Sequence, residues 1–373
     1  MFSEYNLRIE FVIHPIFTAK REKNGNIISI QGPLDIGDKE LLIYACVSYI
    51  PDLAKKEINE KIRKAIEESL AAERDFERMK QKLKSIVRNL NDPIYLEKTS
   101  EKDIEDAKSL LLWLLEGNFL FLGFRSYRII HEQGEIFVQA DEKDALGILR
   151  DVEHSKFKQK KNISILPPIA QERIKKGEVF VIDKTNAISN VYRKTRMDYI
   201  SIACFDRKGK IVRRNVFMGM FMPQALIERA SSIPFLKSKL DRVLFEEGIS
   251  ENSFEYQHIT DIFNTLPKEE LFVLKTRDLG DIIRKLLTSE TEQQVHVFIV
   301  PIASVRGFSL VVVLPYRLYS RTTVDKITYF LEQAFNAANI EYNTITQSSR
   351  IIRLHYYIVS REKRLPDIKS IER

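Results

Sequence analysis

The stretch Leu110–Tyr127, LLLWLLEGNFLFLGFRSY, most constrains the fold, because the sequence pattern changes within it. Before it, apolar residues recur every three or four positions, which predicts helix. Gly117 is the expected helix end, since glycine is typical of a C-cap. From Phe119 to Phe124 apolar side chains occupy both faces of a predicted strand. Helix, glycine and aromatic strand together predict a buried joint between two domains.

Size and composition indicate a globular protein. The 373 residues predict two or three domains of about 150 residues each. No apolar run reaches the ~20 residues of a membrane span, and the N-terminus lacks a signal-peptide pattern. Cys46 and Cys204 lie in apolar strand-like runs, so reduced thiols and a cytoplasmic location are expected. The net charge of +7 is spread over small clusters with acidic neighbours, which predicts no nucleic-acid partner, and without an apolar span no membrane partner is expected.

The first ninety residues predict strands followed by one long helix. Leu7–Ala19 alternates as a strand, Asn24-Gly25 indicates a hairpin turn, and the apolar Leu41–Ile50 predicts a covered strand. A helix is expected from Asp52. Its heptad seam favours either a coiled-coil contact or packing against its own domain. The seam residues are Ile58, Ile62, Ala65, Ser69, Ala72, Phe76, Met79, Leu83, Ile86 and Leu90.

The middle of the chain predicts a strand-rich domain from Phe119 to Phe221, with a hairpin turn at Asp206–Lys210 and an exposed loop at Lys156–Lys161. Pro234–Glu246 and Glu255–Thr265 are predicted linker helices. The expected strands cover residues 119–130, 135–139, 178–183, 190–194, 199–205 and 211–221.

The last hundred residues predict a ferredoxin-like β-α-β-β-α-β order plus one strand. Asp278 is the expected cap of its first helix, which runs to about Leu287, and Thr322–Asn339 is the second. The predicted strands are Leu271–Lys275, Val295–Ile302, Gly307–Leu314, Ile340–Gln347 and Ile351–Val359.

Known catalytic motifs are missing from the sequence. The thirteen glycines never lie two apart, so the dinucleotide fingerprint does not occur, nor does GxxxxGK[ST] or GxSxG. The six histidines show no metal-ligand spacing. A non-enzymatic chain without catalytic residue, cofactor or metal is the direct interpretation, while catalysis by residues scattered along the sequence stays open.

A small-molecule site is a further candidate. Thr276-Arg277-Asp278-Leu279-Gly280 joins a predicted strand to a helix, where free N–H groups can hold a carboxylate and Gly280 would permit close approach. Arg277 could add a bidentate contact, and an ordinary capped turn is the alternative. A second polar cluster, which would bind an anion or cap the next helix, comprises Arg317, Tyr319, Arg321 and Thr322.

Several phrases in order carry a resemblance to a known family. They are IHPIF at 13–17, LLWLLEGNFLFLGFRSY at 111–127, LGILR at 146–150, SNVYRKTRMDYISI at 189–202, VFMGMF at 216–221, IPFLKSK at 233–239, TLPKEELF at 265–272, LPYRLYSRTTVDKI at 314–327 and SSRIIRLHYYI at 348–358. With these phrases the chain resembles the N-terminal, non-catalytic region of the large bacterial NAD-specific glutamate dehydrogenases.

The resemblance implies an α+β fold in which ferredoxin-like ACT-type units flank a PAS-like mixed domain, joined by long helices. The implied parts are a truncated ACT-like unit with the heptad helix (1–92), a helix plus PAS-like domain (93–228), a helical linker (229–268) and an ACT-like domain (269–373). In the family this region precedes a separate catalytic domain that oxidises glutamate to 2-oxoglutarate with NAD. NAD is therefore expected in the parent family and no cofactor in this chain.

The chain also departs from the family. Tyr192 stands where the family usually has His, and Val300-Pro301-Ile302 replaces a basic pair followed by Asp, so any ligand contact of those charges is lost. The sequence ends before the position at which the family's catalytic region would lie, so no catalytic residue can be carried over, and the first strand and helix of the first ACT-like unit are expected to be missing. Leu41–Ile50 would then be unpaired, which predicts dimerisation through this edge, local disorder or a reading frame that begins too late.

The leading hypothesis is a regulatory and assembly segment of glutamate catabolism without turnover. Its expected partners are further copies of itself or a catalytic glutamate dehydrogenase polypeptide, with an amino acid as effector. A free-standing amino-acid-binding ACT/PAS-type sensor is the alternative, and a decayed remnant of a longer enzyme is the third.

Overall fold

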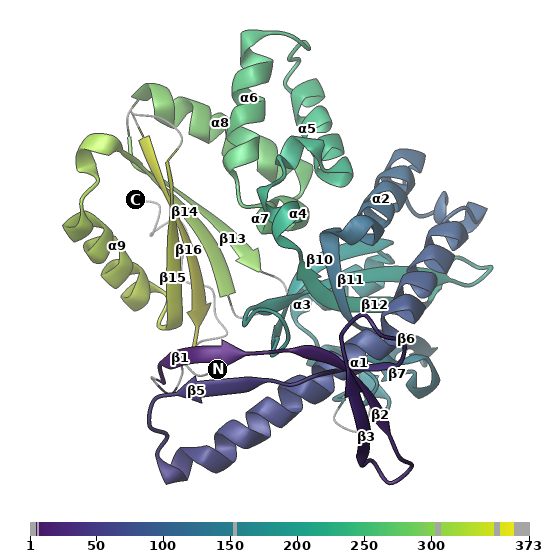
Figure 1. Ribbon diagram of the computed structural model, residues 1–373. Coiled ribbons are helices and arrows are strands. Elements are labelled where there is room, and N and C mark those ends of the chain that lie inside the picture. The colour runs from purple at the N-terminus through teal and green to yellow at the C-terminus, as the bar shows by residue number, and fades with distance from the viewer. Residues whose placement is uncertain are drawn as a thin grey trace. The chain divides into compact units, whose positions relative to one another are not determined.

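The computed structural model describes residues 5, 7–151, 155–292, 294–302, 307–346 and 351–361 of a mixed α and β chain (Figure 1). It divides into two compact units. Unit 1 comprises residues 1–67 and 190–194, and unit 2 comprises residues 68–189 and 195–373. The domain boundaries expected from the family resemblance stay a prediction.

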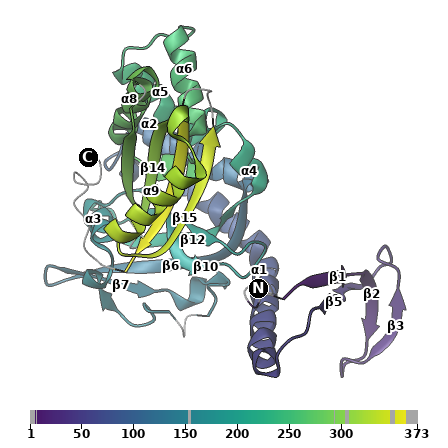
Figure 2. The same ribbon diagram turned by 90° about the vertical axis from the view of Figure 1, so that its left-hand side faces the viewer.

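Unit 1 contains a long antiparallel ribbon (Figure 2). The predicted strand at Leu7–Ala19 is confirmed as two strands that meet at His14-Pro15, because proline has no N–H and restricts the residue before it. The predicted turn is confirmed at Glu22–Asn26, where Gly25 has a φ of +91°. The strands are β1 (Ile9–Ile13), β2 (Ile16–Arg21), β3 (Ile27–Gln31), β4 (Asp38–Leu41) and β5 (Tyr44–Val47), ordered β1-β5 and β3-β2-β4.

The apolar segment Leu41–Ile50 is not covered as expected. Leu41, Leu42, Ile43 and Tyr44 are each more than half exposed. Sheets of only two and three strands leave most of both faces open, so apolar sequence alone does not bury this segment. The expectation of an unpaired strand is also wrong, since Tyr44–Val47 pairs with β1.

The long helix α1 (Asp52–Asn89) packs against its own chain in its C-terminal half. There the seam residues Met79, Leu83 and Leu90 are buried with α2 (Glu101–Trp113) in one hydrophobic core. The packing interpretation of the seam is therefore confirmed for this half. In the N-terminal half the seam residue Ile58 is also buried, whereas Ile66 and Leu70, which lie outside the seam, are about half exposed.

The predicted joint at Leu110–Tyr127 is confirmed as buried. After α2, the backbone makes a π turn at Leu114–Asn118, in which Gly117 has a φ of +93°, and enters the long strand β6 (Phe119–Glu132). Leu110, Leu111, Leu114, Phe119 and Phe121 are all buried there.

Strand β6 lies in a seven-stranded sheet ordered β10-β11-β12-β6-β7-β9, with β8 also paired to β6. The predicted strand at 190–194 is wrong, since this segment forms bends in which Tyr192 has a φ of +63°. The predicted turn at Asp206–Lys210 is confirmed. The other strands are β7 (Glu135–Ala140), β8 (Leu146–Gly147), β9 (Lys161–Asn162), β10 (Phe180–Ile188), β11 (Arg196–Phe205) and β12 (Ile211–Phe221).

Five helices, α4 to α8, follow the seven-stranded sheet in the chain, and α3 lies between its strands β9 and β10. The predicted helices at Pro234–Glu246 and Glu255–Thr265 are confirmed as α5 and α6. The predicted strand at Leu271–Lys275 is wrong, because Pro267 precedes a short helix there. The helices are α3 (Pro168–Lys176), α4 (Pro223–Ile227), α5 (Pro234–Glu246), α6 (Phe254–Thr265), α7 (Lys268–Val273) and α8 (Thr276–Glu292). Single turns are η2 (Pro93–Tyr95), η4 (Glu142–Asp144), η5 (Ile163–Ile165), η6 (Ala230–Ser232) and η7 (Tyr316–Leu318).

The last sheet is antiparallel with the order β13-β14-β16-β15. Its strands are β13 (His296–Ile302), β14 (Gly307–Pro315), β15 (Ala337–Thr346) and β16 (Ile351–Ser360), all close to their predicted positions. Helix α9 (Arg321–Ala334) connects β14 to β15 and ends earlier than predicted, at Ala334, shortly before Asn336 with a φ of +43°. The order β-β-α-β-β does not confirm the ferredoxin-like prediction.

The two faces of this sheet carry different helices. Alternate residues Leu310, Val312 and Leu354 pack with α9, which lies along one side of the sheet (Figures 1 and 2). The other set, including Val313 and Ile351, shares a core with α8. In a split β-α-β-β-α-β unit both helices would follow strands of the same sheet, whereas α8 here follows helix α7.

Candidate functional site

The predicted ligand-binding turn lies at the start of α8. Thr276, Arg277 and Asp278 occupy the first helical turn rather than a strand–helix loop. Arg277 and Asp278 are exposed and Thr276 is half-buried. Gly280 faces α5: a Cβ atom added there would lie 3.9 Å from atoms of Val243 and Glu247, which is an ordinary contact distance. Gly280 therefore does not provide the predicted close approach of a ligand.

The second predicted cluster lies on the other face of the sheet. Arg317 and Tyr319 are exposed in and just after the turn η7, and Arg321 is exposed at the first position of α9. The cap of α9 is Ser320, whose hydroxyl accepts a hydrogen bond from Thr323 N at 3.1 Å. Because α8 and α9 pack on opposite faces, the structure does not bring the two predicted clusters together.

A polar joint that the sequence analysis missed connects α6 and α7 to the last sheet. His355 on β16 contacts the Glu270 carboxylate of α7 through Nε2. The same nitrogen lies 2.8 Å from the Ser309 hydroxyl on β14. Ser309 and Glu270 are both buried. Ser, His and Glu here do not form a catalytic triad, in which the acid holds one ring nitrogen and the hydroxyl meets the other.

Two further contacts complete this joint. The buried Arg353 donates a hydrogen bond to the Thr265 hydroxyl at the end of α6. The Arg196 guanidinium of β11 lies 3.6 Å from the ring centroid of Tyr357 on β16, at cation–π distance. Polar side chains therefore join three parts of unit 2: the seven-stranded sheet, the α6–α7 turn and the four-stranded sheet. We call this set of seven residues the polar joint: Arg196, Thr265, Glu270, Ser309, Arg353, His355 and Tyr357.

A cleft of about 720 Å³ lies between α3 and α8. It includes the predicted residue Asp278, with Arg173 and Glu178 on the opposite wall. Arg173 is already bound to Asp183, at 2.8 Å from Nη1 to Oδ2, and lies 3.5 Å from Glu178. The basic and acidic side chains of the cleft partly neutralise one another, so its chemistry does not select one ligand class.

Lys239 on α5 holds the end of α7. Its ammonium donates hydrogen bonds to the carbonyl oxygens of Leu271, Phe272 and Leu274 at 2.7–2.9 Å. These carbonyls lie at the C-terminal end of α7, where no intrahelical donor remains. Burial, reinforced by the nearby charge of Arg242, lowers the pKa of Lys239 to about 7. The residue therefore fixes the α7–α8 turn.

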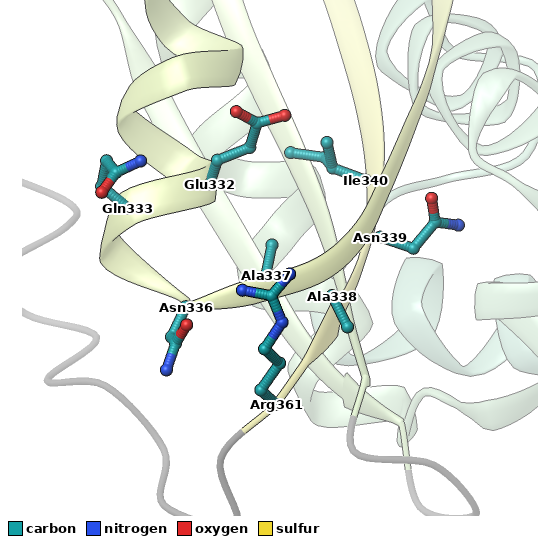
Figure 3. Close-up of a pocket in the computed structure, with 8 residues that line it drawn as sticks. All are labelled: Glu332, Gln333, Asn336, Ala337, Ala338, Asn339, Ile340 and Arg361. Carbon is teal, nitrogen blue, oxygen red and sulfur yellow. The ribbon is translucent and has the colours of Figure 1, made fainter.

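A second hollow, of about 750 Å³, lies between the end of α9 and the start of β15 (Figure 3). Its walls carry the polar side chains of Glu332, Asn336, Asn339 and Arg361, all of which are exposed. Within the described residues no group of His, Cys, Asp and Glu side chains has the arrangement of a metal site.

Except for Ser309, the missed residues lay in phrases already singled out in the sequence. Thr265 and Glu270 belong to TLPKEELF, Arg196 to SNVYRKTRMDYISI, and Arg353 and His355 to SSRIIRLHYYI. Each phrase read alone gave a strand or helix pattern. Their convergence depends on contacts between elements that are far apart in the sequence, which local periodicity does not show.

Comparison with known families supports the resemblance. The family described as "Glutamate dehydrogenase, helical motif 1" matches residues 233–292, and the family described as "Glutamate dehydrogenase, ACT2 domain" matches residues 296–373. The chain is related to the NAD-specific glutamate dehydrogenases. The first match covers α5 to α8, and the second covers the four-stranded sheet with α9.

Curated relatives of this chain are NAD-specific glutamate dehydrogenases. The protein of Pseudomonas aeruginosa is 25% identical over 80% of this chain and 18% of its own length. The protein of Halomonas elongata is 23% identical over 85% of this chain and 20% of its own length. The enzyme of Mycobacterium tuberculosis is 23% identical over 72% of the chain and 15% of its own length. The chain thus spans about a fifth of the length of these relatives.

Among solved structures, the periplasmic sensory domain of the Campylobacter jejuni chemoreceptor Tlp1 is 13% identical, with a TM-score of 0.19 over 78% of this chain and 93% of that one. No helix among the described residues is long and apolar enough to cross a membrane.

The positions at which the chain departs from the glutamate dehydrogenase pattern can be placed only in part. Tyr192 is exposed, in a left-handed backbone conformation. The backbone of Val300-Pro301-Ile302 lies in β13 and pairs with β14, and the side chains of these residues lie outside the described part.

Proposed function

We propose that this chain is a non-catalytic regulatory and assembly segment of NAD-specific glutamate dehydrogenase, and that glutamate oxidation belongs to a catalytic domain outside it. One observation carries the proposal: helical motif 1 and the ACT2 domain follow each other in the chain and share one hydrophobic core. Leu240 of α5, Ile283 of α8 and Val313 of β14 all belong to that core. The sequence also contains none of the glycine spacing that a dinucleotide-binding turn needs.

The polar joint gives this segment a physical means of regulation. Its buried charged groups bind α6 and α7 to the sheet through specific contacts, so a shift of the helices must break them. A ligand that binds one arrangement of the helices more tightly would change the affinity for a partner that also distinguishes the arrangements. By linkage, the partner would change the affinity for the ligand by the same free energy. We propose an amino-acid effector, a cytoplasmic location, and a catalytic glutamate dehydrogenase polypeptide or further copies of the chain as partners. The finer assignment of ACT-type units around a PAS-like middle domain belongs to this proposal.

The absence of turnover is tested with the purified chain, NAD and glutamate. We expect no NADH absorbance above that of a sample without protein. NAD reduction that depends on glutamate and on protein concentration would refute the proposal. The assembly role is tested by mixing the chain with a separately expressed catalytic region of a relative and measuring co-elution.

An amino-acid sensor that acts by itself is the second candidate. It is favoured by the exposed Arg277 at the free N–H groups of the first turn of α8 and by Asp278 in the wall of the 720 Å³ cleft. Calorimetric titration with glutamate, aspartate and branched amino acids tests it. Binding that Arg277→Ala abolishes and Arg284→Ala preserves would support the sensor, because Arg284 is a second exposed arginine of α8, paired with Asp281. No heat with any of these amino acids would favour the assembly role.

A further inference from the structure

The four-stranded sheet has two edges of different character. Its edge strand β13 contains Pro301, which has no N–H to offer a further strand. The other edge, β15, is ten residues long, with one charged residue, Glu341, and neither proline nor lysine. Proteins normally blunt edge strands with such residues or keep them short. In the described part of the chain, β15 therefore lacks these protective features.

The edges of the seven-stranded sheet provide a comparison within the same unit. One edge strand, β9, has only two residues. The other, β10, carries Asp183 and Lys184 and packs beside α7. Both devices limit pairing with another chain. Of the two sheets of unit 2, as far as their residues are described, only the last therefore has a long edge strand without these features.

Exposed aromatic residues accompany the β15 edge. Tyr342 packs on Tyr356, with ring centroids 5.4 Å apart, and still exposes 47% of its surface. Tyr329 on α9 is 65% exposed. Figure 3 shows Glu332 of α9 and Ile340 of β15 on two sides of the hollow beside this edge. The edge and its flank therefore offer both main-chain hydrogen bonds and aromatic surface.

We infer that β15 pairs antiparallel with β15 of a second copy of this chain, with Tyr342 on the two-fold axis. In that register Glu341 lies opposite Asn343 and Ile340 lies opposite Thr344, so the only charged residue of the strand faces an amide. A register centred on Glu341 would place two carboxylates opposite each other, which is unfavourable. The strand is thus complementary to itself, as a two-fold interface requires.

This dimer specifies the partner in the assembly role proposed above. Sedimentation of the full chain over a wide concentration range should show a monomer–dimer equilibrium. Asn343→Glu places two pairs of like charges across the axis and should weaken the dimer about tenfold. Asn343→Lys, at the same exposed position, places opposite charges there and should strengthen it. Circular dichroism spectra that match the wild type confirm that both variants fold.

Cross-linking tests the register. Tyr342→Cys places two thiols opposite each other on the axis, and oxidation should give a covalent dimer. Thr344→Cys is the matched control, because its thiols would lie about 13 Å apart along the strands, beyond disulfide reach. The unchanged chain, with Cys46 and Cys204, gives the background.

The outcomes separate this inference from the proposed function. A monomer at all concentrations, or a dimer that Asn343→Glu does not weaken, would overturn the β15 pairing. Cross-linking of Thr344→Cys as fast as that of Tyr342→Cys would overturn it as well. Each of these results leaves the absence of NAD reduction unaffected, whereas NAD reduction by a β15 dimer would overturn only the proposed function.

Discussion

The Arg150 guanidinium holds the buried carboxylate of Asp75, with 2.6 Å between Nη2 and Oδ1. The same carboxylate accepts a hydrogen bond from Gly147 N at 2.8 Å. Asp75 belongs to α1 and its partners to the loop around β8. One carboxylate therefore attaches the long helix to the seven-stranded sheet. Hydrophobic periodicity would have placed this charged residue on the solvent face of the helix.

Asp75→Ala should lower the free energy of unfolding by about 3 kcal/mol, because it leaves Gly147 N without its acceptor and removes the anion that faces Arg150. Urea unfolding measures the change. Glu77→Ala is the control, since Glu77 is 71% exposed in its pair with Lys80 and should matter by less than about 0.5 kcal/mol. Equal losses in the two variants would contradict the role of Asp75.

The Asp75 contact also predicts a pH dependence. Burial alone would raise the pKa of Asp75, but the Gly147 N–H and the Arg150 guanidinium outweigh it and hold the pKa below its ordinary value. The unfolded chain then binds the proton more readily, so the contribution is complete above about pH 4 and is lost as the pH falls through the lowered pKa. The stability gap between wild type and Asp75→Asn should be constant near neutrality and shrink below about pH 4. A gap that grows on acidification would disprove this assignment.

Gly147→Ala should be among the most damaging small substitutions. Gly147 has a φ of +59°, and an added Cβ would lie 2.1 Å from the carbonyl oxygen of Leu122. Gly134 also has a positive φ, +84°, but nothing lies within 4 Å of its Cβ position. Gly134→Ala should therefore cost only about 1 kcal/mol of backbone strain, and Gly147→Ala clearly more. Thermal unfolding of the two variants in parallel decides between a steric and a purely conformational cost.

The sequence predicted elements better than their assembly. The joint at Leu110–Tyr127 and the last four strands were found because local periodicity and glycine placement determine them. The strand prediction at Leu271–Lys275 was wrong because so short a run of mostly apolar residues suits either a strand or a short helix. The contact from Lys239 to the carbonyl oxygens of α7 cannot be seen in the sequence. The polar joint could not be predicted for a related reason, since Glu270 and His355 are 85 residues apart in the sequence.

The polar joint should contribute a measurable pairwise free energy. Glu270→Gln removes the anion beside His355, and His355→Asn removes the ring. Because the two side chains are in contact, their combined effect on unfolding should differ from the sum of the single effects by at least about 0.5 kcal/mol. Glu255→Ala, at an exposed position in the first turn of α6, is the control and should add to His355→Asn without coupling. Additivity in the first pair would mean that Glu270 and His355 do not support each other.

Lys239 should make stability rise with pH in a range where surface lysines have no effect. Burial lowers its pKa to about 7, whereas an unfolded lysine titrates near ~10.4. Between these values the unfolded chain binds the extra proton, so raising the pH favours the folded state. Compared with Lys239→Met, which cannot titrate, the wild type should gain stability from pH 7 to pH 9. Lys237→Met, at an exposed position on the same helix, should show no such relative gain. Parallel urea titrations at the two pH values measure the difference, and identical pH slopes for wild type and Lys239→Met would show that the ammonium at the end of α7 keeps an ordinary affinity for its proton.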